Sequence, residues 1–115
     1  MKRQILQMDD PVFLPGQAKT AKATITISPG GLSCQAELFL ATSPTGAKAA
    51  TSGLKLFTST GGPQIISLPV TMPSAGGVAY HVYLDVYVEG YLLMAYVATE
   101  DVIIPSGSVG PITWE

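Results

Sequence analysis

Apolar and polar residues alternate with a period of two along most of the chain, a pattern typical of β-strands with one buried face. Residues 21–28 place alanine and isoleucine on one face and lysine, threonine and serine on the other, and residues 34–42 repeat this alternation. Further strands are expected at 54–58, 64–72, 80–88, 91–99 and 102–104. Pro69 lacks an amide hydrogen, so the strand that contains it should be an edge strand or bulged.

Turn-forming residues separate these expected strands, notably Pro29-Gly30-Gly31, the stretch 43–46, Gly61-Gly62-Pro63 and Glu89-Gly90. Strands about 8–12 residues apart, with no helical periodicity, are typical of an antiparallel sandwich. The sequence therefore predicts an all-β, immunoglobulin-like two-sheet sandwich of about seven strands. A single domain is expected over residues 1–115, with a core at about 11–104 and a tail at 105–115.

Residues 68–82 read Leu-Pro-Val-Thr-Met-Pro-Ser-Ala-Gly-Gly-Val-Ala-Tyr-His-Val. This segment resembles the corner between strands E and F of immunoglobulin-like domains, and is most similar to bacterial and archaeal CARDB-type modules. The resemblance implies a structural corner in which Pro73 ends one strand, Gly76 lies in the turn and Tyr80 opens the next strand. The tyrosine ring would then pack under the turn, with its hydroxyl bonded to the upstream backbone.

The sequence departs from these relatives in lacking paired cysteines and a core tryptophan, and it has Pro29-Gly30-Gly31 where many CARDB modules have Asn-Thr-Gly. The resemblance implies adhesion at a cell surface. Residues 1–10, however, lack the apolar stretch of a signal peptide. We therefore expect an intracellular or virus-particle component, unless the chain is an excised domain of a surface protein.

Composition excludes several classes of protein. Hydrophobic residues make up 47% of the chain and charged residues 12%, which excludes intrinsic disorder. A net charge of −2 does not favour binding to nucleic acid or to an anionic membrane. No run approaches the roughly 18 apolar residues of a membrane span, so we expect no membrane insertion. The single cysteine, Cys34, rules out an internal disulfide.

Candidate catalytic and metal-binding groups are few. His81 is the only histidine, and Asp85, four residues along the same strand, would lie roughly 13 Å from it. Asp9-Asp10 suits a turn, and Glu100-Asp101 lacks the spaced acids of a calcium loop. Cys34 is expected to be a buried, inert thiol. We therefore expect no enzyme, no metal site and no cofactor.

The predicted hairpin around Glu89-Gly90 carries the one distinctive surface. Pairing its strands outward from the turn aligns Val86 with Leu93 on the core face. The opposite face would then be apolar and exposed, with these residues as a predicted interface: Tyr83, Tyr87, Leu92, Met94 and Tyr96. We expect a protein partner there, most simply a second copy. Alternatively, a loop or the tail around Trp114 covers this face.

The sequence thus predicts a non-catalytic structural or protein-binding module that self-associates through the outward face of the 80–99 hairpin. The alternative is a carbohydrate-binding module. Its sugar-stacking aromatics would be Tyr83, Tyr87, Tyr91 and Trp114. Against the alternative, sugar sites need hydrogen-bonding groups beside the rings, whereas Leu92 and Met94 accompany these tyrosines.

Overall fold

The computed structural model describes residues 10–114, which form eight strands and no helix. The strands are β1 (Ala18–Thr26), β2 (Ser33–Ala41), β3 (Ala50–Thr51), β4 (Lys55–Thr58), β5 (Pro63–Thr71), β6 (Val78–Val88), β7 (Tyr91–Val97) and β8 (Val102–Ile104). The predicted all-β class is confirmed. The eighth strand is the two-residue β3, which lies in a small-residue stretch without a strand signal.

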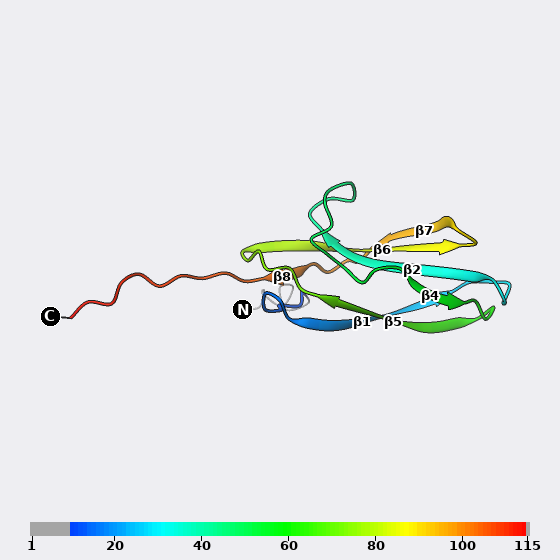
Figure 1. Ribbon diagram of the computed structural model, residues 1–115, viewed down its shortest axis with the longest axis horizontal. Helices are drawn as coiled ribbons and strands as arrows, with labels where there is room; N and C mark the ends of the chain where they lie inside the picture. Colours follow the sequence, from blue (N-terminus) through cyan, green and yellow to red (C-terminus); the bar gives the residue numbers. More distant parts are fainter. Residues whose placement is uncertain (1–9, 115) are drawn as a thin grey trace, which may run out of the picture.

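The strands form two antiparallel sheets that lie one over the other (Figure 1). One sheet consists of β1 and β5, paired over nine residues from Ala18↔Thr71 to Thr26↔Pro63. The other has the order β3-β2-β6-β7, with β4 also paired to β2 and β8 to β6. Two antiparallel sheets packed face to face form the two-sheet architecture of a β-sandwich.

Pro69 lies in β5 opposite Thr20 of β1. Within residues 10–114, β5 pairs with β1 alone, so one of its edges is free to accommodate a residue without an amide hydrogen. The predicted edge position of this strand is confirmed.

The core lies between the sheets and follows the alternation of the sequence. The smaller sheet contributes Ile25, Ile66, Leu68 and Val70, and the larger one contributes Cys34, Ala36, Leu38, Leu40 and Val86. Each of these side chains is at most 7% exposed. The alternating residues on either side of them face outward, as a half-buried sheet requires.

The corner between β5 and β6 has the geometry of a tyrosine corner. The Tyr80 side chain is buried, and its hydroxyl donates a hydrogen bond to the Ala75 carbonyl at 3.5 Å. Pro73 is also buried. Gly76 is required for space, because a Cβ there would lie 2.5 Å from the carbonyl oxygen of Pro105. The corner therefore also holds the chain where it leaves β8.

Candidate functional site

The hairpin of β6 and β7 turns tightly at Glu89 and Gly90, whose φ angles are 52° and 87°. Two positive φ angles define a type I′ turn, which matches the twist of the flanking strands. The Ser33 amide donates to the Glu89 carboxylate, and the Glu89 amide donates to the Ser33 carbonyl, both at 2.8 Å. The tip of the hairpin is thereby fixed to the start of β2.

A β-bulge interrupts this hairpin two residues beyond the turn. Tyr87 pairs with Leu92, but Val86 pairs with Met94, which leaves Leu93 as an extra residue in β7. The predicted alignment of Val86 with Leu93 is therefore wrong. Side chains alternate between faces, so a shift of one residue reverses the face of every later residue in the strand.

The bulge divides the predicted interface between two faces. Tyr83, Tyr87 and Leu92 remain on the outward face, as expected. Met94 and Tyr96 instead share the inward face of β6, opposite Val86 and Leu84, and do not join the other three. The prediction of one outward patch is corrected accordingly.

A loop of the same chain covers part of the outward face. Lys48, in the loop between β2 and β3, lies with its Nζ 4.7 Å from the centre of the Phe39 ring. Phe39 in turn stacks on Tyr83 with ring centres 5.1 Å apart. The Lys48 side chain thus lies over Phe39, the neighbour of Tyr83 on this face.

Glu37 anchors this loop to the sheet. Its carboxylate accepts hydrogen bonds from Lys48, at 2.8 Å, and from the Thr51 hydroxyl. Burial raises the pKa of Glu37, but the two hydrogen bonds and the charge of Lys48 outweigh burial and hold the pKa below its ordinary value. The hydrogen bond to Glu37 raises the pKa of Lys48. Both groups are thus charged at neutral pH.

The inward side of the hairpin opens into an apolar groove of about 730 Å³ between β1 and β7. β6 and β2 form its floor. The side chains that define it are Ala21, Ala23, Val82, Leu84, Met94 and Tyr96. A smaller hollow of about 120 Å³ shares Ala21, Leu38 and Val82 with this groove and reaches the core residues Leu40 and Val70. The groove therefore continues into the space between the sheets.

The groove is open because no described strand covers it. Among residues 10–114, β1 pairs with β5 alone and β7 pairs with β6 alone, so the strand edges that border the groove are unpaired. Met94 and Tyr96 face the opposite sheet, yet they are 40% and 58% exposed. Alanines at 21 and 23 leave the facing side of the groove shallow. Two small residues in an otherwise aliphatic inward row are the sequence signal for it.

The structure also places His81 beside an acid from another part of the chain, Asp101. His81 Nδ1 lies 2.8 Å from Asp101 Oδ1, and the Asp101 amide donates to the Asp10 carboxylate at 3.1 Å. This pair is not predictable from strand spacing, because 20 residues separate its members. Asp9 lies outside the described residues. No group of three or more His, Cys, Asp or Glu that could hold a metal occurs in residues 10–114.

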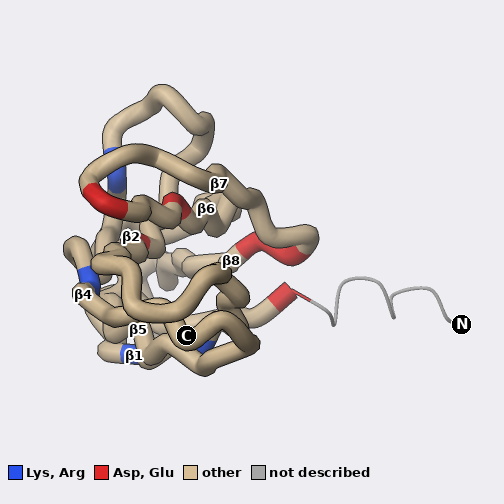
Figure 2. Tube along the Cα trace, turned by 90° about the vertical axis from the view of Figure 1, so that its right-hand side faces the viewer, with Lys and Arg blue, Asp and Glu red and all other residues tan. Residues whose placement is uncertain are grey.

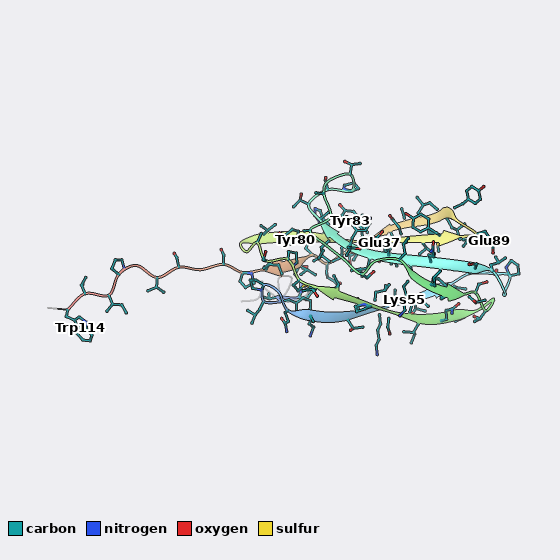
Figure 3. The ribbon with its side chains drawn as sticks, viewed as in Figure 1. Glu37, Lys55, Tyr80, Tyr83, Glu89 and Trp114 are labelled. Carbon is teal, nitrogen blue, oxygen red and sulfur yellow. The ribbon has the colours of Figure 1, made fainter. Side chains whose placement is uncertain are left out.

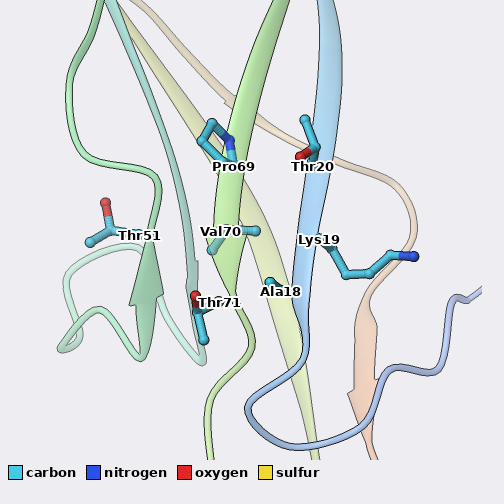
Figure 4. Close-up of a pocket in the computed structure, with 7 residues that line it drawn as sticks. All are labelled: Ala18, Lys19, Thr20, Thr51, Pro69, Val70 and Thr71. Carbon is cyan, nitrogen blue, oxygen red and sulfur yellow. The ribbon is translucent and has the colours of Figure 1, made fainter.

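The remaining hollows and charges suggest no chemistry. A shallow hollow of about 290 Å³ lies over the ends of β1 and β5 (Figure 4), and its only charged residue is Lys19. The acidic and basic residues are spread over loops and strand edges without a basic concentration (Figure 2). Cys34 is buried, at 1% exposure, as expected.

The four aromatic residues considered for sugar stacking do not share one surface. Tyr83 packs against Phe39, and Tyr91 follows the hairpin turn and is 80% exposed. Trp114 lies at the far end of the tail, well beyond the sheets (Figure 3).

Comparisons with known proteins found no matching family model, no similar curated protein and no similar solved structure. Residues 10–114 contain no helix with the length and apolar character needed to cross a membrane. A functional assignment of the chain therefore rests on its fold and on the groove.

Proposed function

We propose that the chain is a non-catalytic structural module that binds an extended protein segment in the groove between β1 and β7. The observation that carries this proposal is the exposure of Met94 and Tyr96 on the inward side of the hairpin. Aromatic residues and methionine are enriched at protein interfaces. A core-facing surface of this kind gains free energy when it is covered, at about 25 cal/mol per Å² of apolar area.

The expected ligand is a β-strand because the groove offers two things that a strand needs. Its bordering edges, on β1 and β7, present unpaired backbone groups. Its floor presents aliphatic side chains such as Val82 and Leu84, which suit alternate side chains of an added strand. In strand addition, backbone hydrogen bonds supply affinity and side-chain pockets supply specificity.

A role without catalysis agrees with the chemistry of the groove. Its polar groups are the amine of Lys22 and the hydroxyls of Thr24, Thr26 and Tyr96, and its lining contains no carboxylate, imidazole or thiol. His81 and Asp101 bond to each other outside the groove lining. We keep the resemblance to CARDB-type modules as part of this proposal, together with an intracellular, virus-particle or excised surface-domain setting. Carbohydrate binding is the alternative, which the arrangement of the aromatic residues does not favour.

Selection of displayed ten-residue peptides on the full chain tests this proposal. We expect peptides with alternating apolar residues to be enriched. Their binding should weaken by about tenfold or more with Met94→Arg, because truncated or blocked interface centres cost well over 1 kcal/mol. Leu92→Arg is the matched control, since Leu92 lies in β7 on the outward face, and it should change binding by less than about threefold. No enriched peptide, or equal losses with both variants, would contradict the proposal.

A further inference from the structure

The C-terminal tail, residues 105–114, carries apolar side chains that are largely exposed. It forms no strand and projects beyond the end of both sheets (Figure 1). Val109, Ile112 and Trp114 are 87%, 78% and 92% exposed. Residues 105–114 contain no charged side chain, and Glu115 follows them in the sequence. We propose that the tail of one copy adds as a strand beside β7 in the groove of a second copy, an inference that rests on the proposed function.

The tail is aimed away from the groove of its own chain. β8 pairs with the start of β6, and the Gly77 amide donates to the Ile104 carbonyl at 2.6 Å. Pro105 and Ser106 then pass so close to Gly76 that a Cβ there would meet both. These contacts fix the first residues of the tail along the direction of β8. To enter the groove of its own copy, the chain would have to reverse its direction at Pro105 and Ser106.

The length of the tail matches the groove. The groove follows β1 over residues 21–26, or roughly 20 Å at the rise of an extended strand. Residues 108–114 span roughly 23 Å in the same conformation. One tail is therefore long enough to cover the whole groove of a second copy.

The alternation within the tail determines which side chains enter. Ile112 and Trp114 share one face of an extended strand, and Val109 and Pro111 share the other. The proposed strand runs parallel to β7, because only in this direction do inward-facing Ile112 and Trp114 point their backbone groups toward β7. The missing amide hydrogen of Pro111 then falls on the open edge, where a proline is tolerated. Gly110, which precedes Ile112 on the inward face, adds no side chain.

Trp114 is the only tryptophan in the chain, so its fluorescence reports directly on insertion. Full-length protein over a dilution series should show emission that shifts to the blue, and falling acrylamide quenching, as concentration rises. Ile112→Ser and Met94→Ser should raise the midpoint concentration by about tenfold or more. Val109→Ser and Leu92→Ser, on the opposite faces of the tail and of β7, are the matched controls and should leave the midpoint nearly unchanged.

Two results would overturn the inference. A blue-shifted emission that does not depend on concentration would place the tail in the groove of its own chain. Emission typical of exposed tryptophan at every concentration would mean that the tail does not insert. If selected peptides still bind in a Met94-dependent manner, the proposed function survives either result and only the tail is excluded as the occupant. Circular dichroism of each variant checks that the sandwich is intact.

Discussion

Glu37 shows at the scale of one residue how a long-range contact changes the role of a side chain. Strand alternation places it on the outward face, where a carboxylate is ordinarily solvated. The structure buries it under a loop, with Lys48 and Thr51 as partners. The alternation predicts the face correctly. It cannot predict the cover, because the partners come from a loop whose path depends on the completed sheet.

Replacing Glu37 tests this anchor. Glu37→Gln should lower the free energy of unfolding by about 1 kcal/mol at neutral pH, since Lys48 is partly exposed and water screens the pair. The folded-state pKa of Glu37 is lowered, so the unfolded chain takes up the proton first and the stabilisation is lost as pH falls. The difference between wild type and variant should be full above pH 4.5 and shrink below it. Urea unfolding at several pH values measures it.

Asp85→Asn is the control for that experiment. Asp85 lies directly across from Glu37 on the same face, and its carboxylate accepts no hydrogen bond within residues 10–114. Asp85 acts on Lys48 only through its charge, so its replacement should change the pH dependence of stability much less than Glu37→Gln does. A loss for Asp85→Asn as large as that for Glu37→Gln would contradict a specific role for the Glu37 anchor.

At the scale of elements, most of the fold follows from the alternation of residues, whereas the key feature of β7 does not. The period of two predicts seven of the eight strands to within about three residues, including the edge position of Pro69. The bulge at Leu93 is not predictable in the same way, because Tyr91 to Ala98 contains no charged residue to mark the solvent face. Any register buries an apolar side chain there. The groove is not predictable from alternation either, because Met94 and Tyr96 face it only as a result of this bulge.

The hairpin turn provides a test at this scale. Gly90 has a φ of 87° with open space around it, so Gly90→Ala strains the backbone without a steric clash. We expect a loss of about 1–2 kcal/mol in the free energy of unfolding. Gly62→Ala is the matched control, since Gly62 also has open space but no positive φ, and it should be neutral or slightly stabilising. Equal effects of the two substitutions in urea unfolding would contradict the assigned turn.

At the scale of the whole molecule, the tail points away from the groove of its own copy, so the proposed contact joins two copies. The long axis measures 72 Å, much of it tail (Figure 1). Contacts between a tail and a foreign groove are head-to-tail, and such contacts form open chains or rings. The sequence predicts self-association, but it places the contact on the outward face and treats the tail as a possible cover for its own chain.

Light scattering across a concentration series tests this form of assembly. The mass of the full chain should rise above that of the monomer as concentration rises, to a fixed value if the contacts close into a ring and without limit if they form an open chain. A chain that ends at Ile104 should remain a monomer throughout. Growth that continues unchanged without the tail would exclude it as the connecting element.

The most direct measurement is disulfide trapping between copies of different mass. One copy carries Ile112→Cys and the other carries Met94→Cys, both with Cys34→Ala so that no other thiol is present. Under mild oxidation, we expect a covalent product that joins the two copies. Pairing Ile112→Cys with Leu92→Cys should yield far less, because Leu92 faces away from the groove. No Ile112–Met94 product, or equal yields from both pairings, would contradict insertion of the tail into the groove of a second copy.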